Sequence, residues 1–287
     1  MLLGVILLWL AMLVGSMFSF PYTSFILPDA TWSSYLGFGN LFFIISIPVV
    51  IVLLYFWRYT TQNTIPNWAK TSLSLFWLGN LISISMLGGY VGRQFMAGNS
   101  ITETQTLYIE SDTLKLGLSG SLLGNEKYLS IEGNDSELNL YGKDLVSSNV
   151  KLDILPSTTK QFELERHYTS RGSDLRDSEI HADQIEYNFS FARNTLYMSP
   201  DFLIREGKKW RNQKVHFVLK VPRGKNVYLP DGISKVLNSI DADWDRKKRR
   251  FQYGGNTWKM EDNGLICPEC EEKIEKKKKS SKSENLS

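Results

Sequence analysis

Two cysteines separated by two residues are the part of this sequence best suited to chemistry. Cys267 and Cys270 enclose Pro268 and Glu269 near the C-terminus, and the chain has no other cysteine. A structural zinc site needs about four ligands, usually two such pairs or one pair with histidines. A thioredoxin-type pair opens a helix after a strand, whereas a charged tail follows this one. The pattern therefore favours a local disulfide that closes the last strand, with metal binding second and redox catalysis third.

A run of five basic residues is the second candidate site. It comprises Arg246, Lys247, Lys248, Arg249 and Arg250. Basic residues beside aromatics suit nucleic acid, anionic lipid or the phosphates of glycans. They also suit a solvated loop or an edge strand whose charges prevent aggregation. We favour the solvated segment and keep lipid or glycan contact as the functional alternative.

The remaining polar residues do not suggest an enzyme. Asp241, Asp243 and Asp245 alternate but lack the glycine and distal glutamate of a calcium loop, so a turn is expected. No Ser-His-acid spacing and no glycine-rich phosphate loop are present. The three histidines are isolated in the sequence: His167, His181 and His216. We therefore predict no catalytic residues, no bound metal and no cofactor.

The N-terminal third lacks the charged surface that a soluble domain needs. Asp29 is the only charged residue among the first 57. Three apolar runs, at about 2–20, 35–57 and 73–91, approach the length of about 20 residues that crosses a bilayer as a helix. We predict three transmembrane helices within residues 1–95. Asn40 and Asn80 lie inside the second and third runs, where hydrogen bonds between helices are expected.

The short loops between these runs predict their orientation. The loop 21–34 has no Lys or Arg, whereas the loop 58–70 contains Arg58 and Lys70. Because basic loops stay in the cytoplasm, we expect an inner-membrane protein with its C-terminal domain in the periplasm. That location removes nucleic acid as a partner of the basic run. The first run lacks the basic start and the cleavage site of a signal peptide, and we expect a version of a longer protein without its N-terminal module.

The rest of the chain is predicted to be a mainly β domain, residues 101–270, with one short helix. Alternating apolar and polar residues indicate strands with one buried face, at 114–119, 138–141, 150–154, 162–165 and 215–221. Short strands at nearly regular spacing favour an antiparallel or solenoid-like arrangement. Residues 173–187 fit a helix, and the charged tail 271–287 is expected to be disordered.

Several motifs resemble membrane proteins of the phage-shock-protein-C (PspC-like) family of the Bacteroidetes type. The matching segments are Thr169–Ser173, Gly207–Val215, Val221–Gly224, Val227–Leu229, Gly255–Met260 and Gly264–Cys270. Their most recognisable positions are Trp210, Arg211, Gly224, Trp258, Met260 and Gly264. The order of spans followed by a β domain is also similar to that family.

The resemblance implies a cell-envelope protein linked to envelope stress. It also implies an outer β domain related to adhesin-head or toast-rack-like domains, and it offers no catalytic residues to carry over. The small PspC domain that usually precedes the spans has no counterpart in this sequence. If that domain carries the signal, this chain is expected not to signal through it.

The expected function is non-enzymatic display of a β domain from the membrane, as a stress-linked sensor, regulator or scaffold. The first alternative is an adhesin-like module that binds glycan or anionic lipid, with Trp210, Trp244 and Trp258 near its surface. The second is a metal or redox protein built on the cysteine pair. Expected partners are the lipid bilayer and an envelope protein, glycan or anionic lipid, but not nucleic acid. A homo-oligomer is left open.

Overall fold

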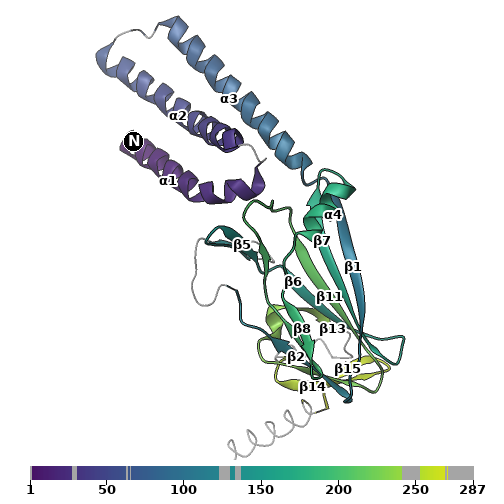
Figure 1. The fold of residues 1–287 in the computed structure, drawn as a ribbon. Helices are drawn as coiled ribbons and strands as arrows, with labels where there is room; N and C mark the ends of the chain where they lie inside the picture. Colours follow the sequence, from purple (N-terminus) through teal and green to yellow (C-terminus); the bar gives the residue numbers. More distant parts are fainter. Residues whose placement is uncertain are drawn as a thin grey trace, which may run out of the picture. The chain divides into compact units, whose positions relative to one another are not determined.

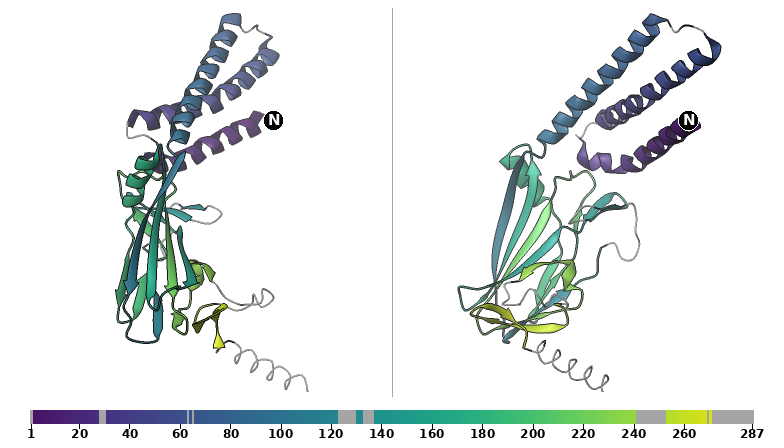
Figure 2. Two further views of the ribbon diagram at one scale, coloured as in Figure 1. Left: turned by 90° about the vertical axis from the view of Figure 1, so that its right-hand side faces the viewer. Right: turned by 180° about the vertical axis from the view of Figure 1, so that it is seen from behind.

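The structure is a computed structural model that describes residues 2–27, 31–62, 64, 66–122, 130–132, 137–240, 253–268 and 270. The chain divides into two compact units. The first contains the N-terminal helices with two short segments from later in the chain, 172–174 and 207–211. The second contains almost all of the strands (Figures 1 and 2).

Three helices make up most of the first unit within the described residues. They are α1 (Leu2–Ile26), α2 (Thr31–Thr61) and α3 (Asn67–Arg93). Among the described residues, two segments are long and apolar enough to cross a membrane, Ser33–Thr61 and Asn67–Arg93. Large apolar side chains such as Phe76, Ile82 and Met86 are exposed on α3, as expected of a helix that faces lipid.

Polar groups inside α2 are satisfied by α3. The Nδ2 of Asn40 donates to Ser83 Oγ at 2.8 Å, which confirms the expected bond between helices. Pro48 lies inside α2 and has no N–H to donate to the carbonyl of Ile44, four residues earlier. The indole nitrogen of Trp77, on α3, donates to that carbonyl at 3.2 Å. The neighbouring helix thus replaces the hydrogen bond that proline removes.

The other asparagine of the apolar helices behaves differently. Asn80 is buried, and its Nδ2 donates to the carbonyl of Phe76 in its own helix at 2.8 Å. The expected bond between helices is therefore wrong for Asn80. A side-chain bond to the preceding turn satisfies the donor locally, so no partner on another helix is required.

A five-stranded mixed sheet, in the order β1-β7-β11-β6-β13, contains the longest strands of the second unit. Figure 1 shows β1, β7 and β11 as long neighbouring strands. The strands are β1 (Ala97–Leu107), β6 (Val150–Pro156), β7 (Phe162–Gly172), β11 (Lys214–Val221) and β13 (Leu237–Ile240). β11 pairs antiparallel with β7 and parallel with β6. The predicted antiparallel arrangement is therefore wrong for this sheet, which is mixed.

A six-stranded sheet follows the order β15-β14-β12-β2-β9-β8. Its strands are β2 (Thr113–Leu118), β8 (Phe189–Ala192), β9 (Thr195–Met198), β12 (Asn226–Leu229), β14 (Asn256–Glu261) and β15 (Gly264–Ile266). β2 pairs in parallel with both β12 and β9. Strands that are distant in sequence thus lie side by side, as with Asn226 and Thr113.

A smaller sheet has the order β10-β5-β4-β3 and is antiparallel. Its strands are β3 (Ser130–Glu132), β4 (Glu137–Tyr141), β5 (Asp144–Ser147) and β10 (Phe202–Ile204). On β4 the buried position is Asn139, while Leu138 and Leu140 are only partly buried. The sequence had predicted the leucine face to be buried, so the orientation of this strand was predicted wrongly.

The helix α4 (Leu175–Asp183) is shorter than the predicted 173–187. Ser178 and Ala182 are buried as expected, but Leu175 is exposed. Glu186 exchanges two backbone hydrogen bonds with Leu203 of β10. Strand pairing therefore takes over the residues that were expected to extend the helix. A short 3₁₀ turn, η1 (Ile233–Lys235), leads into β13.

The core of the second unit follows the predicted alternation on its central strands. Val150, Leu152 and Ile154 on β6 are at most 2% exposed, and Val215, Phe217, Leu219 and Val221 on β11 are 0% exposed. Val218 is also buried, at 8%. β11 therefore buries residues on both faces, which is typical of a strand in the middle of a sheet.

Candidate functional site

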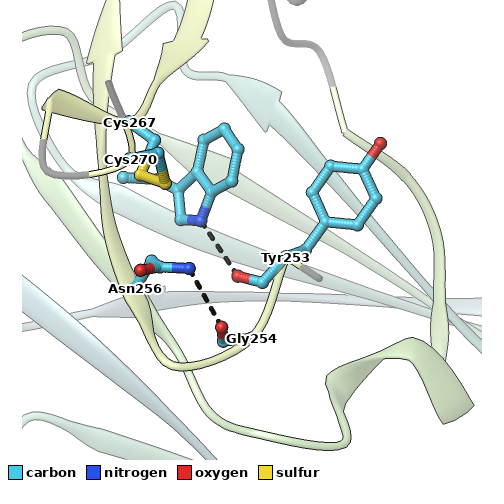
Figure 3. The surroundings of a disulfide bond; sticks show 6 residues. Tyr253, Gly254, Asn256, Cys267 and Cys270 are labelled. Carbon is cyan, nitrogen blue, oxygen red and sulfur yellow. Dashed lines mark hydrogen bonds between the residues drawn. A yellow bond between two sulfur atoms is a disulfide. The ribbon is translucent and has the colours of Figure 1, made fainter. Parts of the chain in front are cut away.

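The two cysteines are joined by a disulfide just after the last strand (Figure 3). Cys267 and Cys270 are 2% and 1% exposed. Figure 3 shows the pair near Asn256, whose side chain donates to the carbonyl of Gly254 at 3.0 Å. Reactive disulfides are exposed or strained, and bonded sulfurs offer no thiolate to a metal. This buried bridge suits a structural staple better than redox chemistry.

The strand beside the disulfide carries two of the family-like positions. Trp258 and Met260 on β14 are 1% and 0% exposed, and the Trp258 indole nitrogen donates to the carbonyl of Tyr253 at 3.2 Å. The adhesin-like interpretation required Trp258 to lie near the surface. Its burial contradicts that requirement. Since Lys259 pairs with Ile266, the next pair in this register is Trp258 with Cys267. The disulfide thus lies against the tryptophan strand.

Gly264 and Gly224 serve the turns of this region. Gly264 has a φ of 105° where β15 begins, and Gly224 has a φ of 78°. The N–H of Lys225 donates to the carbonyl of Pro222 at 3.2 Å. A positive φ at the third position of such a turn defines a type II turn and favours glycine there.

The segment Gly207–Arg211 caps the end of α1. The last four carbonyls of a helix have no partner within it, and α1 has no basic residue in its last turn. The Arg211 Nη1 donates to the carbonyl of Ile26 at 3.2 Å, and the Trp210 N–H donates to that of Phe25 at 2.9 Å. The Lys209 amine donates to the carbonyl of Ser24 at 2.7 Å. The loop supplies the cations that suit the negative end of a helix dipole.

The same loop reaches the residue that follows α3. The ring centroids of Phe95 and Trp210 are 5.7 Å apart, and the Arg211 guanidinium lies 5.3 Å from the centre of the Phe95 ring. Arg211 is only 3% exposed. A buried arginine of this kind is bound by carbonyls and by an aromatic face. Trp210 and Arg211 therefore hold the C-terminal ends of α1 and α3 to one loop.

Two histidines that are far apart in sequence meet on the five-stranded sheet. His167 on β7 pairs in register with His216 on β11, and their ring centroids are 5.8 Å apart. The Nε2 of His216 lies 2.7 Å from Asp153 Oδ2, and the Nδ1 of His167 lies 2.9 Å from Thr102 Oγ1. The sequence did not predict this meeting. Both histidines occupy outward positions of alternating strands, but the pairing of the strands was unknown.

The pKa of Asp153 is lower than that of an ordinary aspartate. Partial burial raises the pKa of Asp153, but hydrogen bonds from Asn238, Ser239 and His216 outweigh it and lower that pKa below its usual range. The third histidine, His181, lies apart on α4, with its Nε2 3.4 Å from Asp177. No group of three or more metal-ligating side chains occurs among the described residues.

The basic run lies outside the described residues: Arg246, Lys247, Lys248, Arg249 and Arg250. Trp244, the alternating aspartates at 241–245 and the tail 271–287 also lie outside them. Lipid or glycan contact by this run stays a prediction.

Residues 139–273 match the family model described as the toast-rack found in some PspC proteins. The chain therefore carries a C-terminal domain of the PspC toast-rack type, and the resemblance stated from the motifs is confirmed. No curated protein and no solved structure gives a significant match to the chain.

Proposed function

We propose that this protein is a multi-pass, membrane-anchored envelope protein whose toast-rack domain acts in the periplasm without catalysis. The domain serves as a stress-linked sensor, regulator or scaffold that presents its surfaces to a partner in the envelope. One observation carries the proposal. A PspC-type toast-rack domain follows apolar helices in the same chain, and only Gln94, Phe95 and Met96 separate α3 from β1.

The capped end of α1 supports a third membrane span. α1 is a 25-residue helix without a charged side chain. Its last carbonyls and the residue after α3 contact one loop, 207–211. If α1 and α3 both cross the bilayer, their C-terminal ends belong on the same side of it. One loop of an exported domain reaches both ends only in that arrangement, with the α2–α3 connection on the cytoplasmic side.

A short connection and a capping loop also support a regulatory role. A change in the helices reaches β1 through three residues and reaches β11 through Arg211, which is three residues before that strand. Such a double connection transmits a displacement in either direction. A flexible tether would display a domain equally well but would not couple its state to the membrane.

Labelling of single cysteines in spheroplasts tests the location of the domain. The native cysteines are buried, so we replace both with alanine and introduce either Tyr108→Cys or Thr64→Cys. Tyr108 is 78% exposed beside the end of β1, and Thr64 is exposed between α2 and α3. A membrane-impermeant maleimide is expected to label the cysteine at 108 in intact cells and the one at 64 only after lysis. The reverse pattern would place the toast-rack domain in the cytoplasm.

Expression of envelope-stress genes tests the regulatory role separately. We compare the full chain with a chain that ends after Met96 and with a full-length Arg211→Ala variant. The truncated chain is expected to alter the stress response, and Arg211→Ala is expected to weaken the response to a stimulus while the protein stays in the membrane. Unchanged expression in the truncated strain would leave only the scaffold role.

A further inference from the structure

We propose that a polar pocket at one end of the five-stranded sheet binds the phosphate of an anionic lipid headgroup. The pocket lies where β1 and β11 begin and β7 ends, and it has a volume of about 410 Å³. We name it the Arg171 pocket. It is lined by Gly98, Asn99, Ser100, Thr169, Ser170, Arg171, Asn212 and Lys214. The proposal rests on the proposed function only for the presence of a membrane near this domain.

The lining offers donors to an anion and no carboxylate to repel it. The lining contains two cations, Arg171 and Lys214, together with amide and hydroxyl side chains. It contains no Asp and no Glu. Lys214 pairs in register with Thr169 across β7 and β11. Arg171 is two residues further along β7 on the same face, so it is the diagonal neighbour of Lys214. Two cations converging on one polar hollow are the usual basis of phosphate recognition.

Neither cation is neutralised within the described part of the chain. No acidic side chain among the described residues forms an ion pair with Arg171 or Lys214, and both are exposed. The Arg171 side chain lies over Gly98 of β1, because its Cδ and Nη1 lie 3.4 Å from where a Cβ on Gly98 would be. The glycine leaves room for the arginine to lie over β1. An unpaired guanidinium beside open backbone can present its planar fork of donors to an anion.

Chain connectivity brings this pocket near the membrane surface. Gly98 is the fifth residue after Arg93, where α3 ends. Five residues span at most about 17 Å, and the headgroup region is about 5–8 Å deep on each side of the hydrocarbon core, so the chain keeps the pocket within reach of the lipid headgroups. On the other side of the pocket, Asn212 directly follows Arg211, which binds the last carbonyls of α1. A lipid phosphate is therefore the anion that this pocket meets at the highest local concentration.

The sequence motifs agree with this placement. Two segments that carry the family resemblance, Thr169–Ser173 and Gly207–Val215, both contribute to the lining. Asn212 has a φ of 52°, a conformation that asparagine tolerates better than most residues. It allows the capping loop to turn into β11 while the amide remains beside the pocket. The motif thus joins helix capping to anion binding.

Native mass spectrometry of the full chain in an uncharged detergent tests the proposal. The probes are phosphatidylglycerol and a diacylglycerol with the same acyl chains but no phosphate. Arg171→Gln and Lys214→Gln are each expected to reduce the affinity for phosphatidylglycerol about tenfold, since each removes one charge-assisted hydrogen bond. Lys160→Gln, at the other end of the same sheet, is the matched control and is expected to change nothing. Thermal melting of each variant checks that the domain stays folded.

The outcomes distinguish recognition by the pocket from a general affinity for lipid. Equal phosphatidylglycerol binding by the wild type and the Arg171→Gln/Lys214→Gln double variant would overturn the proposal. It would also be overturned if the wild type bound diacylglycerol as tightly as phosphatidylglycerol. Inorganic phosphate that displaces the lipid and binds as tightly would assign the pocket to a free anion and overturn the lipid source. Binding in detergent does not depend on orientation, so labelling at position 108 decides the proposed location independently.

Discussion

The two ends of the five-stranded sheet carry similar basic pockets that differ in whether their cations are paired with carboxylates. The Arg171 pocket lies at one end. The pocket at the other end, which we name the Arg223 pocket, has a volume of about 700 Å³ and is lined by Pro156, Ser157, Thr158, Thr159, Lys160, Pro222, Arg223 and Lys225. Both combine basic residues with hydroxyl groups. At the second end, however, an ion pair 2.9 Å long joins Arg223 to Asp262, and Lys225 is bonded to Asp112.

The difference shows that basic residues in a pocket do not by themselves make an anion site. The Lys225 amine, through its hydrogen bond and charge, holds the pKa of Asp112 below its usual range. Asp112 therefore stays charged and remains ion-paired with Lys225. At the Arg171 pocket no described carboxylate has this role. The first end is available to a ligand. At the second end Arg223 and Lys225 join loops through exposed ion pairs, which contribute little stability.

The largest effect is expected from β11, the strand that runs from the Arg171 pocket to Pro222 in the Arg223 pocket. Phe217 on β11 is 0% exposed and its ring lies 5.0 Å from that of Tyr187. Phe217→Ala should lower the free energy of unfolding by about 3–5 kcal/mol, because it leaves a cavity in the core. Urea unfolding of the purified protein measures this loss. Lipid binding should be lost as well, without any change to a pocket residue. A variant that unfolds like the wild type would contradict the assignment of β11 as the centre of the sheet.

A smaller loss is expected when the disulfide is removed. The double variant Cys267→Ala/Cys270→Ala should lower the free energy of unfolding by about 2 kcal/mol. This is the entropy effect expected for a bridge that closes so short a loop. The bridge belongs to the end of the six-stranded sheet, so the affinity of the Arg171 pocket for phosphatidylglycerol should not change. Melting with and without a reductant provides the check. The reductant should lower the melting temperature of the wild type to that of the variant and leave the variant unaffected.

Local sequence patterns predicted the parts of the fold that depend on one segment at a time. The apolar runs predicted long helices, and alternation on β6 and β11 predicted which side chains are buried. Asn139 was misjudged because alternation gives two faces and not the choice between them. Proteins place apolar residues in the core on average, but a polar residue can occupy the buried side of a short hairpin.

The candidate sites depend on pairings that no local pattern encodes. Arg171 and Lys214 meet only because β7 pairs with β11, and the end of α1 is capped by residues 185 positions later, as with Lys209 and Ser24. The motifs had identified Trp210 and Arg211 as distinctive without indicating their role. An arginine followed by an asparagine with positive φ gives no local signal that it binds a distant helix.

Exchanging the charges of the two pockets tests the comparison itself. Ser100→Asp places a carboxylate in the Arg171 pocket and should lower its affinity for phosphatidylglycerol at least tenfold, about 1.4 kcal/mol. Asp262→Asn releases Arg223 and should give the other end a weak affinity for inorganic phosphate. Titration calorimetry with inorganic phosphate on the double variant Asp262→Asn/Arg171→Gln isolates the new site. No gain of binding there would mean that something other than pairing keeps the Arg223 pocket inactive.

The smallest expected effect lies midway between the pockets, at Asp153. Its pKa is lowered in the folded state by hydrogen bonds that outweigh partial burial. It therefore stabilises the fold fully above the pKa of the unfolded chain, about 3.9, and this contribution is lost as the pH falls through the lower, folded pKa. Asp153→Asn should lower the unfolding free energy at pH 7 by no more than about 1 kcal/mol.

The pH dependence of the unfolding free energy distinguishes the contribution of Asp153 from that of other carboxylates. In urea unfolding at pH 7 and pH 3, the wild type should lose more stability than Asp153→Asn, because the asparagine has no proton to gain. An equal loss in both proteins would show that other carboxylates carry the acid sensitivity. Asp112, which is exposed beside the Arg223 pocket, would then be the residue to replace next. Since the Arg171 pocket is lined by no carboxylate, neither change should alter its affinity for lipid at pH 7.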